Sequence, residues 1–370
     1  MTPARRFALL YAAQFAALGA AMPFVPAALE GGGLSPAEVG LLLAAGTLAR
    51  LLAGPASAPL ADRCGLSPVL MAAAAAAAVT LPGLGLFEGL LLLLALQLLH
   101  NAALAPILPL SDAAAVAEMR RRPFDYGRVR AAGSIAFILG AVVAGWAAAQ
   151  AGPVAALSCA ALCLLAVVPL AHGLPQGPSA AGARPGRWWE PLREPAFRRL
   201  LPVSALIQGS HAVYYGFSTL HWTAAGLSPL LIGALWASGV LAEVLLFLFG
   251  RPLVERLGSR GLALVAGAGG LLRWSVLAAT TDPWLLWAAQ ALHAASFGAM
   301  HLAAIRALAS LPEGLGARAQ TLHAALGVGL ASSLLMLAAG PLYAAFGGGA
   351  FLAMAGLCAL GLAAALRMPP

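Results

Sequence analysis

The sequence predicts an all-α membrane protein with twelve transmembrane helices in two six-helix parallel repeats. Three observations support this fold class. The 370-residue chain is 61% hydrophobic and only 9% charged, whereas soluble domains carry about 25% charged residues. A membrane span needs about 20 apolar residues, so the chain can form about twelve spans with short connectors. The second half of the chain also repeats the first at a constant offset of 193 residues.

The repeat is clearest where two helices are expected to begin. Residues 33–52 read GLSPAEVGLLLAAGTLARLL and residues 226–245 read GLSPLLIGALWASGVLAEVL, with eleven of twenty positions identical. One aligned pair reverses its charge, because Arg50 in the first copy corresponds to Glu243 in the second. Each copy holds six spans, so both copies begin on the same side of the membrane and the repeats are parallel.

The apolar runs predict the individual spans and their orientation. The spans lie at 7–29, 37–60, 67–87, 89–113, 126–149, 153–172, 199–222, 229–250, 261–281, 283–308, 317–344 and 348–367. The first run is too long for the core of a signal peptide and should remain as a span. Connectors on one side carry many arginines, and those on the other side carry none. The positive-inside rule therefore predicts that both termini are cytoplasmic.

The chain divides into two halves around one long polar stretch. Residues 174–198 are rich in Pro and Gly and are predicted to form a cytoplasmic linker between the six-helix halves 1–173 and 199–370. The net charge of +8 is accounted for by the cytoplasmic arginines, so no nucleic-acid partner is expected. No connector holds a nucleotide-binding glycine loop, a metal constellation or a nucleophile elbow. We therefore expect a monomer without cofactors and without enzymatic activity.

Several stretches resemble known transporters. The loop PLADRCG at 59–65, echoed as PLVERLG at 252–258, resembles the signature loop of the major facilitator superfamily. Four further stretches resemble the phenylpropionate permease family, which is close to the sugar–proton symporters: ILPLSDA (107–113), FDYGRVRAAGSIAFILG (124–140), QGSHAVYYGFSTLHWTAAG (208–226) and RWSVLAATTDPWLLWAAQALHAASFGAMHLAAIRA (273–307). The resemblance implies proton-coupled uptake of a small organic solute across the bacterial inner membrane, with aromatic carboxylic acids such as 3-phenylpropionate as the family substrate.

The resemblance has one departure. The related sugar–proton symporters have a carboxylate one turn after the histidine of span 10, whereas this chain has Ser296 or Phe297 there. Their proton-relay scheme therefore does not transfer unchanged.

Four ionisable residues are predicted to lie near the membrane midplane, where sites of such transporters are found: Arg50, Glu243, Arg273 and His293. We expect Glu243 to carry the proton, which the approach of Arg273 or Arg50 would release, and His293 to serve as a proton shuttle. The alternative for Glu243 is a permanent structural ion pair between spans 8 and 9. We expect the planar fork of Arg50 to bind a substrate carboxylate. The alternative for Arg50 is that it only neutralises Glu243.

Further polar side chains at similar depth must face protein or a water-filled cavity. We predict that they line the substrate site: Gln14, His100, Gln208, His211, Tyr214, Tyr215 and Gln290. Hydrogen bonding within the core is the alternative for the histidines. Charged residues near the cytoplasmic helix ends are predicted to gate the transporter, with ordinary surface charge as the alternative: Asp62, Arg63, Asp112, Arg128, Arg130, Glu255 and Arg256.

The favoured function is proton symport of a small organic anion. The alternative within transport is a symporter of a neutral sugar or nucleoside, which should have more amide and carboxylate groups than the single Glu243 and few glutamines found here. A drug-efflux antiporter is disfavoured because span 5 lacks the Gly-Pro pair in which such antiporters resemble one another. A membrane scaffold would not need midplane charges, and an intramembrane enzyme would need a catalytic cluster.

Overall fold

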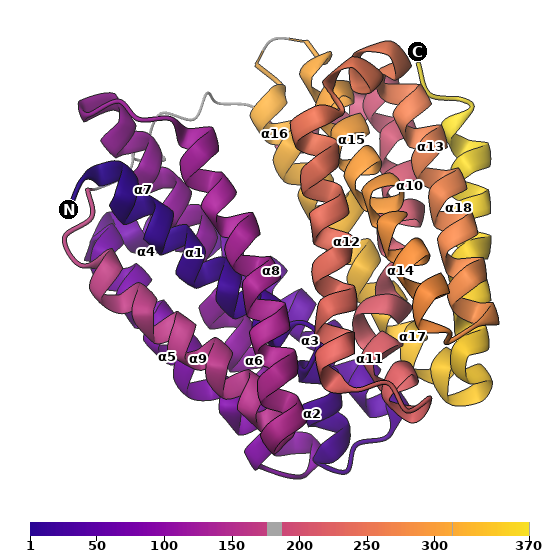
Figure 1. The fold of residues 1–370 in the computed structure, drawn as a ribbon. Coiled ribbons are helices and arrows are strands. Elements are labelled where there is room, and N and C mark those ends of the chain that lie inside the picture. The colour runs from indigo at the N-terminus through magenta and orange to yellow at the C-terminus, as the bar shows by residue number, and fades with distance from the viewer. Residues whose placement is uncertain (176–186, 313, 370) are drawn as a thin grey trace. The chain divides into compact units, whose positions relative to one another are not determined.

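The computed structural model describes residues 1–175, 187–312 and 314–369, which form helices joined by short turns (Figure 1). The predicted linker lies partly outside these described residues, at 176–186. The chain divides into two compact units. Unit 1 comprises Met1–Ala183 and Gly226–Ala237, and unit 2 comprises Arg184–Ala225 and Ser238–Pro370.

Unit 1 contains the helices of spans 1 to 6. In chain order these are α1 (Pro3–Ala21), α2 (Val25–Gly31), α3 (Pro36–Ala53), η1 (Gly54–Ala56), α4 (Ser57–Cys64), α5 (Leu66–Leu86), α6 (Leu90–Leu104), α7 (Ile107–Arg121), α8 (Tyr126–Ala151) and α9 (Pro153–Ala171). Span 4 is broken between α6 and α7, where Pro106 lies and prevents a continuous helix.

Spans 7 to 12 follow in the second half. Their helices are η3 (Glu190–Arg193), α10 (Pro195–Gly209), α11 (Ala212–Ala224), α12 (Pro229–Phe249), α13 (Arg251–Ala279), α14 (Pro283–Ala291), η4 (Ala294–Ala299), α15 (Met300–Ala309), α16 (Gly316–Leu322), η5 (His323–Leu330), α17 (Ala331–Phe346), η6 (Gly347–Gly349) and α18 (Ala350–Ala365). The segments η4 and η5 are π-helical.

The helices account for the twelve predicted spans. By length and composition, eight helices of the described residues can cross a membrane, or nine if the bent pair α1 and α2 is one span. The stretch Gly316–Ala365 holds two spans, which separate at Gly347 with φ +53°. The broken spans α10–α11 and α14–α15 complete the set. The twelve-span prediction is therefore confirmed.

The repeated motif Gly-Leu-Ser-Pro begins a helix in each copy. Gly33 and Gly226 adopt φ values of +85° and +86°, a region that glycine enters without strain. The hydroxyl of Ser35 accepts a hydrogen bond from the Glu38 amide, and that of Ser228 accepts one from the Leu231 amide. Such N-caps satisfy amides at the start of a helix, so the repeat marks the starts of α3 and α12.

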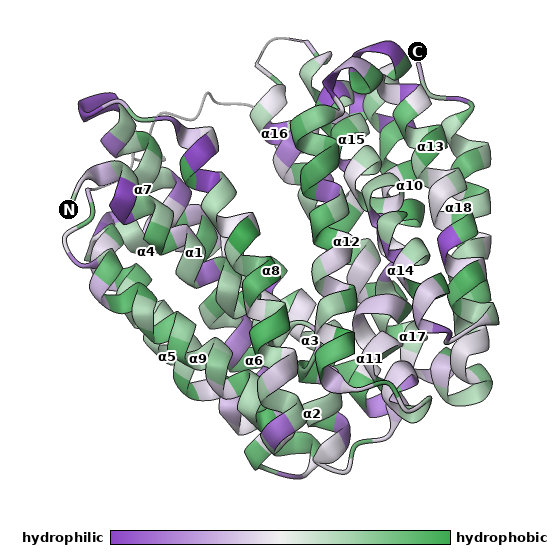
Figure 2. Ribbon diagram, in the orientation of Figure 1, coloured by the Kyte–Doolittle hydropathy of each residue, from purple (hydrophilic) through white to green (hydrophobic). Residues whose placement is uncertain are grey.

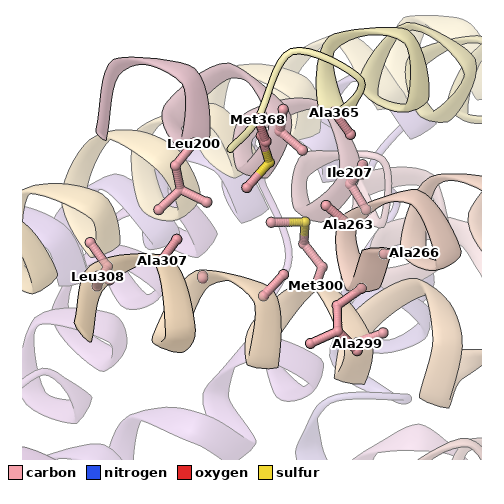
Figure 3. Close-up of a cluster of buried hydrophobic side chains, with 14 of the residues drawn as sticks. Leu200, Ile207, Ala263, Ala266, Ala299, Met300, Ala307, Leu308, Ala365 and Met368 are labelled. Atoms are coloured by element: carbon pink, nitrogen blue, oxygen red, sulfur yellow. The ribbon is translucent and has the colours of Figure 1, made fainter. Parts of the chain in front are cut away.

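Apolar side chains cover most of the helical surface. Leu91 and Trp284 are both 81% exposed, and Figure 2 shows hydrophobic residues along most helices, with hydrophilic residues gathered at helix ends such as that near α7. Such extensive apolar exposure is incompatible with water and fits contact with lipid. Unit 2 also has an internal apolar cluster, in which Ile207 of α10, Ala263 of α13 and Met300 of α15 pack together (Figure 3).

The first part of α12 packs directly on α8 within unit 1. A side chain added at Gly145 would lie 2.7 Å from the carbonyl oxygen of Pro229, and one added at Gly233 would collide with the carbonyl oxygen of Ala141. The two backbones approach this closely only because both positions are glycine.

Candidate functional site

Unit 2 contains a fully buried arginine on α13. The guanidinium of Arg273 donates from Nη1 to Nδ1 of His293 at 2.9 Å and from Nη2 to Oε1 of Gln290 at 2.8 Å. The ring centroids of Tyr214 and Trp274 lie 4.5 and 4.6 Å from its central carbon. Nη1 also donates to the Ser296 hydroxyl at 3.3 Å, so uncharged acceptors and aromatic faces surround this charge.

His293 lies between Arg273 and Glu243. Its Nε2 atom is 3.5 Å from Oε2 of Glu243, and its Nδ1 atom faces the guanidinium. Because arginine has no acceptor, Nδ1 must accept, and a neutral His293 then carries its proton on Nε2, toward Glu243. No direct Glu243–Arg273 ion pair occurs among the described residues; His293 joins the two.

Glycines and a π-turn bring these residues together. Gly239 lies one turn before Glu243 on α12, and a side chain there would touch His293 Cβ at 3.4 Å. Gly298 of η4 likewise allows close approach of Glu243, whose Cγ would lie 3.4 Å from an added Cβ. π-Helical segments are frequent at functional sites, and η4 begins directly after His293.

Three of the predicted span-7 residues join this cluster. Span 7 breaks at Ser210 and His211, and Trp274 Nε1 donates to the Ser210 hydroxyl at 2.9 Å. After the break, Tyr214 accepts from Gln290 Nε2 at 2.7 Å. The ring centroid of His211 lies 5.8 Å from that of His293, and that of Tyr215 lies 5.6 Å from that of His211.

Gln208 precedes this break, and its carbonyl oxygen lies 3.2 Å from Nδ1 of His211. Its side chain is buried, and its Oε1 has no hydrogen-bond partner among the described residues.

Unit 1 places Arg50 against an asparagine that the sequence reasoning missed. Arg50 Nη2 donates to Oδ1 of Asn101 at 2.7 Å. A side chain at Gly46, one turn before Arg50 on α3, would lie 2.6 Å from Nδ2 of Asn101. Arg50 itself is exposed on the surface of its unit, and no ion pair of Arg50 occurs among the described residues.

His100 and Gln14 lie inside unit 1. The Nδ1 atom of His100 is 3.0 Å from the carbonyl oxygen of Ala77 and 3.2 Å from Oγ1 of Thr80. A carbonyl can only accept, so Nδ1 carries the proton of a neutral His100. Gln14 Nε2 donates to the Ser111 hydroxyl at 2.6 Å. Both arrangements fit hydrogen bonding within the core, which was the alternative for His100.

The repeat relates the two histidine sites. The 193-residue offset pairs His100 with His293 and also Thr80 with Arg273. The sequence contains both pairs, but it does not show that Thr80 and Arg273 contact the histidines. Asn101, which corresponds to Ala294, is not singled out by any pattern that distinguishes it from other buried amides.

Two predicted gating residues, Asp112 and Arg130, both contact Tyr11. Oδ1 of Asp112 accepts from the hydroxyls of Tyr11, at 2.6 Å, and Tyr126, at 3.1 Å. The guanidinium of Arg130 lies over the rings of Phe15 and Tyr11, at 4.1 and 5.4 Å from their centroids. Asp112 therefore ties spans 1, 4 and 5 together within unit 1.

Two other predicted gating residues form ion pairs with residues three or four positions away in the chain. Arg128 pairs with Asp125 at 3.2 Å, and Glu255 accepts from Arg251 at 2.8 Å. The hydrogen bond from Arg251 holds the pKa of the Glu255 carboxyl below its usual value. Three more lie exposed near helix ends: Asp62, Arg63 and Arg256.

Comparison with known proteins identifies the family. The sequence profile described as "MFS_1 like family" matches residues 4–353. The chain belongs to the major facilitator superfamily. It is therefore a multi-pass membrane protein and a secondary transporter of a small-molecule solute, not an enzyme.

Curated relatives of this facilitator chain include two named transporters. It is 34% identical over 362 residues to the "Probable 3-phenylpropionic acid transporter" of Escherichia coli K12, covering 95% of this chain and 94% of that protein. It is 27% identical to the maltose permease of Geobacillus stearothermophilus, over 90% of this chain and 86% of the relative.

Solved structures confirm the major facilitator fold. The nucleoside transporter NupG superposes with a TM-score of 0.84 at 16% identity, covering 100% of this chain and 99% of that one. The Escherichia coli xylose transporter XylE, in a partially occluded inward-open conformation, superposes with a TM-score of 0.72 at 12% identity, over 100% and 98% of the two chains.

Proposed function

We propose that this facilitator couples the inward movement of protons to uptake of a small organic anion, such as an aromatic carboxylic acid. The observation that carries the proposal is the buried chain from Arg273 through His293 to Glu243. A carboxyl group beside a neutral imidazole can exchange a proton without leaving an unpaired charge in the membrane. The relative whose name contains 3-phenylpropionic acid supports the choice of solute class.

The hydrogen-bond polarity assigns a role to each residue of the chain. While Arg273 donates to Nδ1, His293 cannot bind a second proton there. The exchangeable proton then resides on Glu243, and His293 orients toward it through Nε2. Movement of Arg273 away from His293 would free Nδ1 and give the proton a second acceptor. Coupling is thereby linked to the position of one side chain on α13.

Arg50 supplies the binding site for the solute carboxylate in this proposal. Its guanidinium is exposed on unit 1 and is held through one nitrogen by Asn101. The remaining donors can form paired hydrogen bonds with a carboxylate.

The distribution of arginines supports a location and an orientation in the membrane. We place the protein in the bacterial inner membrane as a monomer with both termini cytoplasmic, because arginines gather in alternate connectors. Rocking of the two repeats would open the site to each side in turn. Asp62, Arg63, Asp112, Arg128, Arg130, Glu255 and Arg256 would bias that equilibrium.

A neutral sugar or nucleoside is the second candidate solute. Three buried glutamines, Gln14, Gln97 and Gln208, each have an Oε1 without a partner among the described residues, and such acceptors suit hydroxyl groups. The maltose permease relative favours the same candidate.

Uptake into proteoliposomes tests the proposal. An imposed pH gradient, alkaline inside, should drive accumulation of labelled 3-phenylpropionate, and a protonophore should abolish it. Glu243→Gln should lose this accumulation yet retain solute counterflow, which needs no net proton movement. Glu88→Gln, at an exposed connector carboxylate, serves as the control and should retain both. Gradient-driven accumulation by Glu243→Gln would assign the proton to another residue. Uptake of maltose or uridine, but of no carboxylate, would favour the second candidate.

A further inference from the structure

Asn101 is bound to Arg50 in a defined orientation. Its Oδ1 accepts from Arg50 Nη2 at 2.7 Å, and its own Nδ2 donates to the carbonyl oxygen of Gln97 at 3.0 Å. The carbonyl requires a donor and the guanidinium requires an acceptor, so the amide can point only one way. Asn101 is also buried, at 6% exposed. It is a fixed acceptor on α6 for a side chain that reaches it from α3.

Gly46 makes this contact possible. It lies one turn before Arg50 on α3, and a side chain there would come within 2.6 Å of Asn101 Nδ2 and 2.8 Å of Gln97 Nε2. The equivalent Gly239 in unit 2 faces His293 and Gln290. Equivalent glycines therefore serve the two repeats. In unit 1, Gly46 lets span 4 approach the ionisable residue of span 2, and in unit 2, Gly239 lets span 10 approach the ionisable residue of span 8.

The chemistry at the two equivalent places differs. In unit 2, Glu243 faces the titratable His293, and the position equivalent to Asn101 is Ala294. In unit 1, Arg50 faces a neutral amide. An amide oxygen orients a guanidinium and uses one of its five donors, but it leaves the positive charge uncompensated. A carboxylate in the same place would orient the guanidinium and also neutralise it.

We propose that Asn101 is a positioning residue that holds Arg50 ready for an anionic solute without cancelling its charge. Asn101 thereby sets the preference for carboxylates over neutral solutes. The inference rests on the proposed function, because it takes Arg50 as the group that binds the carboxylate. It adds a residue that does not itself touch the solute.

A double-mutant cycle on purified protein tests the inference. Binding of 3-phenylpropionate and of its primary amide is measured for wild type, Arg50→Gln, Asn101→Leu and the double variant. Asn101→Leu alone should bind the acid several-fold more weakly than wild type does. The double variant should differ from Arg50→Gln by less than about twofold in acid affinity. The ratio of acid to amide affinity should fall in the single variant. Thr47→Val is the matched control, because the Thr47 hydroxyl donates to the carbonyl oxygen of Leu43 within α3.

A second variant keeps the test valid if Asn101→Leu does not fold. Asn101→Asp preserves size and the hydrogen bond to Arg50 but supplies an internal carboxylate, and it should weaken acid binding by about tenfold or more while affecting the amide little. Equal losses for acid and amide, or additive losses in the cycle, would overturn the positioning role. Unchanged acid binding in Arg50→Gln, or no carboxylate binding by wild type, would overturn the proposed function as well.

Discussion

Arg273 and Thr80 occupy equivalent positions in the two repeats, and each contacts Nδ1 of the histidine in its own unit. The hydrogen bonds at the two Nδ1 atoms run in opposite directions. Nδ1 of His293 accepts from Arg273, whereas Nδ1 of His100 donates to the carbonyl oxygen of Ala77, beside Thr80. The two imidazoles therefore carry their protons on different nitrogens, and only His293 directs an N–H toward a carboxylate. In the proposed function, the same place in the fold is a proton site in one half and a structural contact in the other.

Arg273→Lys should impair coupling although it retains the charge. Arg273 bonds His293, Gln290 and Ser296 at once through two nitrogens, and a lysine ammonium cannot reproduce this planar set of donors. We expect gradient-driven uptake to fall by about tenfold or more, which corresponds to about 1.4 kcal/mol. Proteoliposome uptake measures this. Wild-type uptake by the lysine variant would show that charge alone suffices.

Thr80→Val should have little effect on transport. His100 keeps its hydrogen bond to Ala77 at 3.0 Å when the hydroxyl is lost, so the expected cost is about 1 kcal/mol of stability. Thermal unfolding in detergent and uptake in proteoliposomes should be measured on the same preparation. Loss of transport comparable to that of Arg273→Lys would mean that both histidine sites take part in coupling.

Tyr11→Phe should destabilise unit 1 more than Tyr126→Phe does. Both hydroxyls donate to one oxygen of Asp112, but at 2.6 and 3.1 Å respectively. Hydrogen bonds to charged groups contribute about 1.5–3 kcal/mol, and the shorter contact should lie at the upper end. Unfolding temperatures of the two variants give the order. In an Asp112→Asn background both effects should shrink, and undiminished losses there would place their cause outside the carboxylate.

Gly233→Val should disturb the packing of α12 on α8. The backbone of α8 leaves no space for a side chain at this position, and overpacking costs about 1–3 kcal/mol. We expect a lower unfolding temperature and reduced transport. Gly356→Val on α18, where an added Cβ meets nothing within 4 Å, is the control. Equal unfolding temperatures of the two variants would contradict the close approach.

The pH dependence of transport should not arise from Glu255. Arg251 holds the pKa of this connector carboxyl below its usual value, so the contribution of the pair to stability is present above the unfolded pKa of about 4.3 and is lost as the pH falls through the folded value. Glu255→Gln should therefore leave the midpoint of the uptake–pH curve unchanged between about pH 5 and 8. A shifted midpoint would place Glu255 in the coupling pathway.

The spans and the repeat could be predicted from the sequence alone. Apolar runs of about 20 residues indicate the spans, and matching residues at a constant offset of 193 indicate the two halves. The π-turn after His293 and the break at Ser210 could not be predicted in this way. Ser210 and His211 are polar and the π-turn reads AASFGA, but residues of these types also occur within regular helices. The change in hydrogen bonding depends on packing against other helices.

The charged residues of the candidate site could be predicted from the sequence, but its neutral residues could not. Arg273, His293 and Glu243 attract attention because charge in an apolar helix is costly. Asn101 and Thr80 are neutral, and their roles depend on which neighbour they meet. The offset would have paired Thr80 with Arg273, but it could not have shown that the two contacts have opposite polarity.

Arg50 and Glu243 occupy the same position in the two repeats but carry opposite charges, and this difference limits how such a protein can arise. An assembly of two identical six-span chains would carry the same residue at both positions, giving two arginines or two glutamates. Neither assembly could present a cation to an anionic solute and a titratable acid to a proton. Joining the duplicated copies in one polypeptide lets each change independently. The two copies of this chain have diverged at this position, so the asymmetry requires copies that differ in sequence and excludes an assembly of identical halves.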